Sequence, residues 1–495
     1  MTTLTIWGGA GEHGRSSYLI RNDQAGILLD CGVKKEAGSE YPLLEVEKIP
    51  ELQAVFLSHA HEDHSAALPL LYKYGYKGKV WTTRETALQL PDYFTAWRNY
   101  VTAGPTPLPF EEADCAAIEY AYLEEHTAPL TWLSLTPNLR VMWGRSGHMT
   151  GSIWVALEWD GKIIFFSGDF TGESQLLGVD EPGLGLFPAA VQKSEENSAE
   201  KTVGEKSEEI VKATPKTATE EITKKTNVGI NVEIDEETLG EAGAMTLTVE
   251  KMSQCSIDLA IIDAAYGVDP ETQSDKLLQL ASAIRSTLEI DGTVLLPVPL
   301  YGRGQELLVW VAEQFPDTTL IAEERLLTPL RELEQSSFWL RETAASRIQA
   351  LLNSDKLHIV SDSDQRRQAM AQSNGTGAII FTEDGMLISS TARWYYDQLS
   401  TSRSSQVIFT GHLPAGSFAQ GLVTSPPADG PAISLIRYKV HQGLPDILDM
   451  LHSIPSHQNV LVHAPDHHNR QAITLLQEKG AAGLHALLPG DQLHF

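Results

Sequence analysis

The chain has few cysteines, no long apolar run and far fewer basic than acidic side chains. Its three cysteines, Cys31, Cys115 and Cys255, are too far apart for a disulfide framework or a C-x-x-C metal pair. No run of about 18 apolar residues predicts a membrane span. The N-terminus lacks the basic and apolar regions of a signal peptide. These absences disfavour disulfide-rich secreted proteins and membrane-spanning proteins, and they favour a reducing cytoplasm.

The charge balance limits which ligands the protein can attract. With 37 Lys and Arg against 65 Asp and Glu, the formal net charge is −28. Residues 191–250 hold 14 acidic and 7 basic side chains, so a charge of −21 remains on the rest of the chain. Proteins that bind nucleic acid in general carry a basic footprint. A nucleic-acid substrate would therefore need a local basic cleft and bound metals.

The order of patterns along the 495 residues indicates an α/β enzyme of two to four domains. Residues 1–185 alternate strand-like runs with turns, and residues 84–126 are predicted to be mostly helical. Residues 190–250 are rich in Glu, Lys, Thr and Ser, which predicts a mostly disordered linker, with an interaction tail as the alternative. Helix and strand patterns alternate again from residue 259 to the end of the chain, without an internal repeat.

The most informative motif lies at residues 57–64, Leu-Ser-His-Ala-His-Glu-Asp-His. It holds four metal-ligating side chains, namely His59, His61, Asp63 and His64. Imidazoles and carboxylates are the ligands that Zn²⁺ and related metals prefer. An apolar run at 54–57 precedes the motif and a helical pattern at 66–71 follows it. We therefore expect a turn between a buried strand and a helix, with its side chains directed at a metal.

Side chains of the same kind follow later in the chain. His148 lies in a glycine-flanked turn, Asp169 ends an apolar strand, and His463 follows another apolar run. Asp30 ends a strand of its own, where a carboxylate can orient a ligand histidine through a hydrogen bond. A single histidine after a strand is usually structural, so these positions become informative only as a set.

Together the ligands predict two neighbouring metal sites. The first site is expected to be formed by His59, His61 and His148. The second is expected to be formed by Asp63, His64 and His463, with Asp169 as the bridging ligand. Two metals roughly 3.5–4 Å apart can hold a hydroxide and stabilise both the attacking and the leaving oxygen. We expect two divalent metals, with Zn²⁺ favoured and Mn²⁺ as the alternative.

In this order the motifs resemble those of the metallo-β-lactamase superfamily. Its first four motifs are matched by Asp30, the cluster at 59–64, His148 and Asp169. The chain is further similar to the β-CASP branch, the nucleic-acid hydrolases that include ribonuclease J and the 3′-end cleavage nuclease of messenger RNA. This second resemblance is carried by residues 8–14, 259–267, 292–308 and 438–441 and by His463.

The resemblance implies an α/β fold in which a four-layer αβ/βα metallo-β-lactamase sandwich receives an inserted α/β β-CASP cap domain. The core would comprise residues 1–189 and 430–495, and the cap would comprise residues 255–429. Residues 190–254 would form the acidic, disordered insertion. His463 matches a branch motif in which histidine accompanies RNA substrates.

The resemblance also implies catalytic and phosphate-binding residues. Asp263 matches motif A and His441 matches motif B, so Asp263 would orient His441, which would supply a proton or bind the phosphate. Catalysis is expected to depend on Asp63, Asp263 and His441. Phosphate is expected to contact Ser389, Ser390, Gly416 and Ser417. Glu383 and Asp384 depart from the branch pattern, because two carboxylates there would repel a phosphate unless they point away.

Three hypotheses follow, and the first is favoured. It is a cytoplasmic, metal-dependent phosphodiester hydrolase, a ribonuclease of RNA processing or decay that acts on single-stranded RNA. The second is a hydrolase of small esters, thioesters or lactones, for which His441 would be dispensable. The third is a non-catalytic scaffold subunit, although inactive relatives typically lose ligands and this chain keeps the set. We expect no membrane partner, and a homodimer is one option. Endonucleolytic and 5′-exonucleolytic cleavage both remain open.

Overall fold

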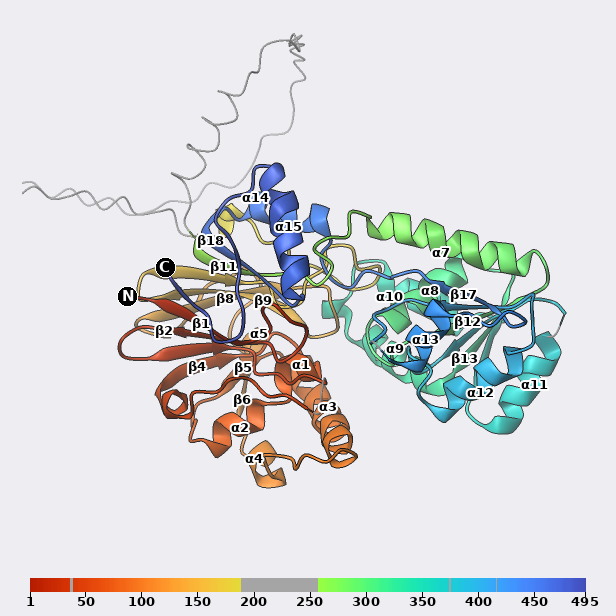
Figure 1. Ribbon diagram of the computed structural model, residues 1–495, viewed down its shortest axis with the longest axis horizontal. Helices are drawn as coiled ribbons and strands as arrows, with labels where there is room; N and C mark the ends of the chain where they lie inside the picture. The colour runs from red at the N-terminus through yellow and green to blue at the C-terminus, as the bar shows by residue number, and fades with distance from the viewer. Residues whose placement is uncertain (36–38, 188–256, 374, 415) are drawn as a thin grey trace, which may run out of the picture. The chain divides into compact units, whose positions relative to one another are not determined.

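The computed structural model describes residues 1–35, 39–187, 257–373, 375–414 and 416–495 (Figure 1). Most strands of its first seven-stranded sheet come from the N-terminal part of the chain. The predicted acidic insertion, 190–254, lies outside the described residues. In spatial order the strands of the first sheet are β20 (Gln492–His494), β1 (Thr3–Gly8), β2 (Ser17–Arg21), β3 (Gly26–Leu29), β4 (Leu52–Phe56), β5 (Val80–Thr82) and β6 (Tyr120–Tyr122).

Helices cover the outer face of this first sheet. The helical segments of this part of the chain are η1 (Val46–Glu51), α1 (Glu62–Ser65), α2 (Leu68–Lys73), α3 (Arg84–Thr102), α4 (Glu112–Ala116) and α5 (Leu123–His126). Apolar side chains of α2 and α3, such as Leu71 and Trp97, pack against Leu28 and Val55 of the sheet. Residues 84–126 are therefore largely helical, as predicted, but they also contain the edge strand β6.

A second seven-stranded sheet packs against the first. Its order is β19 (Leu484–Ala486), β18 (Ser456–Val462), β11 (Ile257–Asp263), β10 (Lys162–Phe166), β9 (Ile153–Trp159), β8 (Leu139–Arg145) and β7 (Leu133–Thr136). Its outer face packs against α14 (Leu444–Ser453) and α15 (Asp466–Glu478). Leu186 of η2 (Leu184–Leu186), which follows β10 in the chain, packs against the same apolar cluster.

The alternation along β10 explains why the sequence of this strand is apolar throughout. Ile164 and Phe166 point into the core between the two sheets, whereas Ile163 and Phe165 pack beneath α14 and α15. Successive side chains of a strand point to opposite faces, so a strand buried on both faces needs an unbroken apolar run. Helices, sheet, sheet and helices form four layers, which confirms the predicted αβ/βα sandwich.

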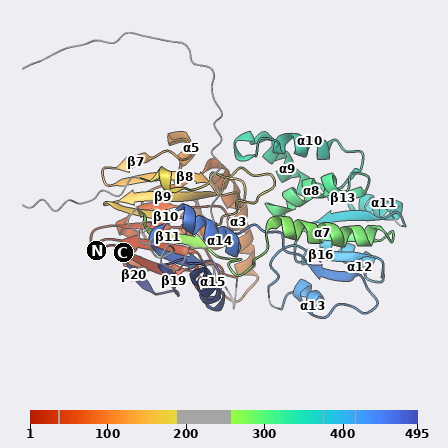
Figure 2. The ribbon, with the colours of Figure 1, turned by 90° about the horizontal axis from the view of Figure 1, so that it is seen from above.

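A separate six-stranded parallel sheet is inserted between β11 and α14 (Figure 2). Its order is β14 (Leu357–Val360), β13 (Thr319–Glu323), β15 (Ala378–Thr382), β12 (Thr293–Pro297), β16 (Gln406–Phe409) and β17 (Ala432–Leu435). One face packs against α7 (Gln273–Leu288), α8 (Arg303–Gln314), α9 (Glu324–Gln335) and α10 (Ala344–Leu352), with η3 (Ser337–Trp339) following α9. The other face packs against α11 (Ser363–Ser373), α12 (Ser390–Leu399) and α13 (Phe418–Thr424).

Both predicted boundaries of the inserted domain need correction. Residues 257–263, predicted to open the cap, form β11, which pairs in parallel with β10 and β18 of the core. Residues 432–435, predicted to belong to the core, form β17, which pairs with β16 of the inserted sheet. An apolar run fits the middle of either sheet equally well, so strand pairing was needed to assign it.

No helix among the described residues is long and apolar enough to cross a bilayer.

Candidate metal centre

The side chains predicted to bind metal lie where buried strands end. Asp30 follows β3, the 59–64 motif follows β4, Asp169 follows β10 and His463 follows β18. Asp30 and His463 adopt positive φ angles of 58° and 64°. Such angles are uncommon and costly for residues with a Cβ atom, and they persist where the surrounding structure enforces them. Here the turns direct both side chains toward the shared edge of the sheets.

One group of ligands consists of His59, His61, His148 and Asp169, whose ligating atoms all lie within 4.8 Å of one another. Nδ1 of His61 is 3.1 Å from Nε2 of His59 and 3.1 Å from Nε2 of His148. Oδ2 of Asp169 is 3.4 Å from the first of these Nε2 atoms and 3.5 Å from the second. A tetrahedral Zn²⁺ with bonds of about 2.0–2.1 Å separates its ligand atoms by about 3.4 Å. The four side chains therefore fit a tetrahedral metal.

A second group consists of Asp63, His64 and His463. Nε2 of His463 is 3.1 Å from Oδ2 of Asp63, and Nε2 of His64 is 3.3 Å from Oδ1 of Asp169. Nδ1 of His463 is buried and has no hydrogen-bond partner among the described residues. Asp169 thus turns one oxygen to each group, which is the arrangement expected of a bridging carboxylate.

Hydrogen bonds behind the ligands fix their orientation. Nδ1 of His64 lies 2.7 Å from Oδ2 of Asp30, and Asp30 also accepts hydrogen bonds from the amide and hydroxyl of Ser58. Nδ1 of His148 lies 2.8 Å from the carbonyl oxygen of Val440. A partner on one ring nitrogen leaves the other available to a metal. Asp30 therefore occupies the orienting position predicted for it.

The electrostatics of the centre suit a cation. Burial, together with the neighbouring His441 and His61, lowers the pKa of His148 to about 3, so its ring is neutral. Burial also disfavours charge on His64, but nearby carboxylates, Asp169 first, raise its pKa to about 9. Burial opposes ionisation of Asp63 as well, yet the His64 and His463 imidazoles hold its pKa well below the usual range. Metals bind ionised carboxylates and neutral imidazoles, so His148 and Asp63 are ready to ligate, whereas His64 would release a proton when a metal binds.

The predicted pair of Asp263 and His441 is also brought to this centre. Nδ1 of His441 is 2.9 Å from Oδ2 of Asp263 and 3.8 Å from Oδ2 of Asp169. Asp263 additionally accepts hydrogen bonds from the amides of Phe170 and Ala265. Although burial acts against ionisation, His441 holds the pKa of Asp263 far below the usual range. Asp263 therefore stays ionised and orients the His441 ring.

The four residues predicted to bind phosphate lie at the starts of α12 and α13 in the inserted domain. The hydroxyls of Ser389 and Ser417 accept hydrogen bonds from backbone amides as N-caps of α12 and α13. Ser390 is exposed in the first turn of α12, and Gly416 is exposed with φ of 78°. None of the four has a contact with a metal-ligating side chain among the described interactions. Their assignment to phosphate stays a prediction.

The carboxylates that seemed unfavourable for phosphate are already engaged. Asp384 accepts hydrogen bonds from the backbone amides of Met386, Ile388 and Ser389. Glu383 forms an ion pair with Arg325. Neither carboxylate is therefore a free charge facing the site.

Two arginines and a tyrosine at the site were missed by the sequence analysis. Nε of Arg303 and Nε of Arg437 are buried and lack hydrogen-bond partners, and neither guanidinium pairs with an Asp or Glu in the described residues. The guanidinium of Arg437 lies 4.5 Å from the centre of the Tyr266 ring, which is 5.0 Å from the His441 ring. Both arginines lie within segments that carry the β-CASP resemblance or adjoin them, but their lack of acidic partners depends on tertiary structure. Guanidinium groups without acidic partners are suited to a phosphate.

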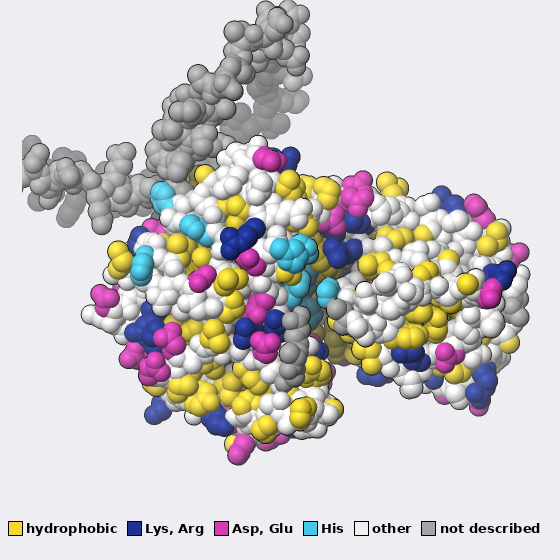
Figure 3. Space-filling model, in the orientation of Figure 1, with side chains coloured by type: hydrophobic (Ala, Val, Ile, Leu, Met, Phe, Trp, Pro, Cys, Tyr) yellow, Lys and Arg dark blue, Asp and Glu magenta, His cyan; other side chains and the backbone are white. Residues whose placement is uncertain are grey.

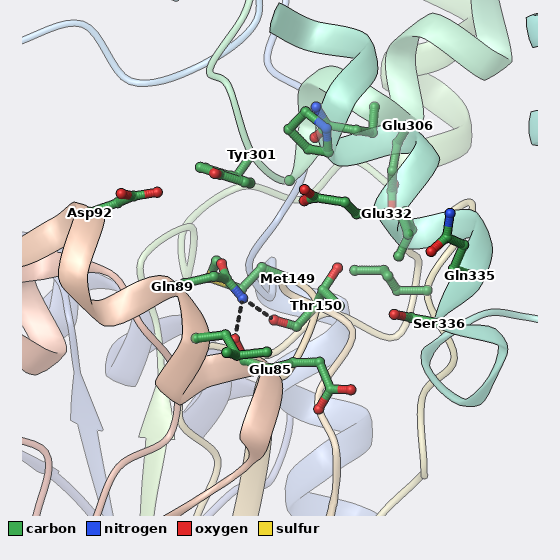
Figure 4. Close-up of a pocket in the computed structure, with 16 residues that line it drawn as sticks. Glu85, Gln89, Asp92, Met149, Thr150, Tyr301, Glu306, Glu332, Gln335 and Ser336 are labelled. Atoms are coloured by element: carbon green, nitrogen blue, oxygen red, sulfur yellow. Dashed lines mark hydrogen bonds between the residues drawn. The ribbon is translucent and has the colours of Figure 1, made fainter.

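Histidine side chains gather in a hollow on the face shown in Figure 3. On the side of Met149 and Gly302, a cavity of about 440 Å³ adjoins this region (Figure 4). Its acidic lining consists of Glu85, Asp92, Glu306 and Glu332, which come from α3, α8 and α9. We call it the acidic cavity. Because carboxylates repel phosphates, a polynucleotide is expected to leave this side free and to pass over Arg303 and Arg437.

A charge reversal tests this path. Replacing the exposed Glu332 by lysine is expected to strengthen the binding of a single-stranded oligonucleotide about threefold at low salt, and less at high salt, because the gain is long-range attraction. The measurement is the salt dependence of the Kd. Glu289→Lys, at the C-cap of α7 outside the cavity, serves as the matched control. An equal gain in both variants would mean that net charge alone is responsible.

Metal removal gives a second test, of stability. A metal present at 1,000 times its Kd stabilises the folded state by about 4 kcal/mol. A domain of 150–250 residues shifts by roughly 2–4 °C per kcal/mol. Chelation is therefore expected to lower Tm by about 10 °C in scanning calorimetry, and added Zn²⁺ should restore it. A Tm that does not respond to chelation, in protein shown to carry metal beforehand, would contradict binding at this buried centre.

Comparisons with known proteins were consistent with this geometry. Residues 10–211 match the model of the metallo-beta-lactamase superfamily. A solved structure of a protein of unknown function from Enterococcus faecalis aligns over 99% of both chains with a TM-score of 0.53 and 14% identity, which supports the fold alone.

Curated relatives point to a narrower group. The chain is 28% identical to transcription termination factor FttA of Methanothermobacter thermautotrophicus, over 84% of this chain and 57% of that protein. It is 23% identical to the probable RNase MJ4 of Methanocaldococcus jannaschii, over 84% and 80%. It is 31% identical to ribonuclease TTHA0252 of Thermus thermophilus, over 34% and 37%. The chain spans little more than half the length of the first of these relatives. The matched model shows that the chain carries a metallo-β-lactamase domain, and its motifs and curated relatives are similar to those of the β-CASP branch.

Proposed function

We propose that this protein is a metal-dependent phosphodiester hydrolase that cleaves single-stranded RNA. The observation that carries the proposal is the bridging position of Asp169 between two ligand groups, next to the hydrogen-bonded pair His441 and Asp263. Two relatives are named as ribonucleases, which supports RNA as the substrate class. The unpaired Arg303 and Arg437 supply positive charge near the centre in an otherwise acidic chain.

We infer that Zn²⁺ occupies both sites, because imidazoles dominate the donor set, and Mn²⁺ is the alternative. When bound, the two metals would supply an activated water at neutral pH and neutralise charge on the phosphate. His59, His61, His148 and Asp169 would hold one metal, and Asp63, His64, His463 and Asp169 would hold the other. Asp63 thereby contributes to catalysis as a ligand.

The chain's own side chains would do the remaining work. His441 turns Nδ1 to Asp263, which leaves Nε2 to hold a proton for the leaving oxygen. Asp263 fixes the orientation of the His441 ring through the hydrogen bond to Nδ1. Arg303 and Arg437 would bind the non-bridging phosphate oxygens as charge builds on them. Attack and departure on opposite sides of the phosphorus would then be stabilised by groups already in position.

We also propose the domain organisation that these roles require. The candidate metal ligands all come from the core. The core would consist of the described residues up to Phe187, of β11, and of the chain from the segment just before α14 onward. Arg303 comes from the inserted domain between β11 and β17. Substrate would therefore be held by both domains. A cytoplasmic location fits an enzyme of RNA processing or decay. The mass in solution, measured in the experiment below, decides whether the protein is a homodimer.

The test is cleavage of 5′- and 3′-labelled single-stranded RNA, with matched DNA, by protein of measured metal content and measured mass in solution. RNA cleavage that depends on metal is the expected result, and the product ladder separates endonucleolytic from 5′-exonucleolytic action. Failure to cleave either polymer by protein carrying two metals per chain would overturn the proposal. Hydrolysis of thioesters or lactones under the same conditions would then indicate the small-ester alternative.

A further inference from the structure

Two histidines outside the metal-ligand groups face each other across the core and the inserted domain. His13 lies in the loop between β1 and β2, and His412 lies in the loop after β16. Their ring centroids are 5.6 Å apart, and the edge of the His13 ring meets the His463 ring at 5.8 Å. His13 is therefore next to the second ligand group, and His412 lies beside His13 on the inserted domain.

The position of His13 is fixed by its loop. The amide of His463 donates to the carbonyl of Gly9 at 2.6 Å, and the amide of Asp466 donates to the carbonyl of Gly11 at 3.0 Å. Gly9 has φ of 84°, and a Cβ atom there would lie 2.5 Å from the hydroxyl of Tyr18. The loop is thus tied to the end of β18 and pressed onto β2. A side chain held by such a loop has a defined place.

The His13 ring has no hydrogen bond within the described part of the chain, although the side chain is half-buried. Its nitrogens are not among the buried polar atoms that lack a partner, so they remain in contact with solvent. Its neighbours are histidines rather than carboxylates at contact distance. The ring nitrogens are therefore available to a ligand.

Positive charge lies beside His412. The preceding residue, Gly411, leaves space that the guanidinium of Arg303 fills, since a Cβ atom at Gly411 would lie 1.9 Å from Nη2. Arg303 has no acidic partner in the described residues, and its Nε lacks any hydrogen bond. Two imidazoles and a guanidinium thus converge on one region, and phosphate is the ligand that this set of donors fits.

We propose that His13 and His412 form a second phosphate subsite, which binds the phosphate next to the scissile one in a polynucleotide. The inference rests on the proposed function and extends it: the preferred substrate would carry at least two consecutive phosphates. A single phosphodiester fills the metal centre alone and gains nothing from this subsite.

Ligand binding tests the subsite without turnover. Adenosine 5′-monophosphate and adenosine 3′,5′-bisphosphate are titrated into zinc-loaded protein by calorimetry. The bisphosphate is expected to bind about tenfold more tightly, which corresponds to about 1.4 kcal/mol. In His13→Leu and in His412→Leu this advantage should fall to about twofold or less. An advantage that survives in both variants would overturn the proposal.

Kinetics give an independent measurement. The same variants are compared on short single-stranded RNA and on bis(p-nitrophenyl) phosphate, which has one phosphodiester. The loss of kcat/KM is expected to be at least tenfold larger for RNA, and the double variant should lose less than the product of the two single losses, because both rings contact one group. His452→Asn, an exposed histidine of α14, is the control for histidine removal.

The outcomes separate this inference from the function on which it rests. If the wild-type protein cleaves neither substrate, the proposed function fails. If it cleaves both and the variants lose equally on both, the enzyme is a phosphodiesterase and the subsite is wrong. His13→Asn, which keeps a hydrogen-bond donor, should retain more of the bisphosphate advantage than His13→Leu. If both fail to fold, as judged by calorimetric Tm, His412→Leu on the inserted domain decides the question alone.

Discussion

Asp169→Asn is expected to lose both metals and to lower kcat/KM for RNA by at least about 10⁴-fold. The two carboxylate oxygens of Asp169 lie 3.3 Å from Nε2 of His64 and 3.4 Å from Nε2 of His59, so one substitution weakens both ligand groups. An asparagine is a neutral and weaker ligand, and residues that act as a unit show large losses when one is removed. Metal per chain by atomic emission and single-turnover cleavage are the two measurements.

The control for Asp169→Asn is Asp258→Asn, which changes a carboxylate that pairs with Lys162 at the far end of β11. It should keep both metals and nearly all activity. If Asp169→Asn keeps two metals per chain, Asp169 is not the bridging ligand. If the variant keeps one metal per chain, the site that stays occupied is the one that depends less on Asp169.

His441→Ala is expected to lower kcat for RNA by about 10²–10⁴-fold while two metals remain bound. This is the usual contribution of a general acid or base. Nε2 of His441 is the atom left free by the hydrogen bond to Asp263. The loss should be much smaller for bis(p-nitrophenyl) phosphate, because its leaving group departs readily without a proton. The ratio of the two losses is therefore the measurement that distinguishes proton donation from phosphate binding.

Asp263→Asn provides the companion variant for His441→Ala. It keeps a side chain that can contact Nδ1 of His441 but replaces the carboxylate oxygen that lies 2.9 Å from this atom by a neutral amide. Its activity on RNA should fall between those of the wild type and His441→Ala. Equal losses on both substrates would indicate that His441 binds the phosphate, and a large loss of metal would indicate that it serves as a ligand.

The candidate metal ligands, which the structure brings together, could be proposed from sequence because their spacing is local. His59, His61, Asp63 and His64 lie on a single turn, and the others each follow a recognisable apolar strand. Arg303 and Arg437 could not be predicted in the same way, since an arginine is informative only when its partners are known. Their missing acidic partners are a property of the folded chain. His13 and His412 were missed for a similar reason, because nearly 400 residues separate rings that lie 5.6 Å apart.

The layers of the fold could be predicted from the sequence, but the boundaries between the core and the inserted domain could not. The inserted helix α7 and strand β12 lie almost where the patterns indicated, at Gln273–Leu288 and Thr293–Pro297. The strand β11 was assigned to the wrong domain because its apolar residues would suit the inserted sheet as well as the core. Only its parallel pairing with β10 and β18 decides between them. Strand pairing is a long-range property that periodicity does not encode.

The Asp63–His463 contact spans 400 residues, and this separation has a consequence for protein synthesis. A ribosome adds about 5–20 residues per second, so roughly 20 to 80 s pass between the first ligands and the last. For most of that time the nascent chain also lacks the carbonyl of Val440 that orients His148. The second metal site therefore stays incomplete until residue 463 has been made. Sequence order thus delays the completed centre until its last ligand has been synthesised, 400 residues after Asp63.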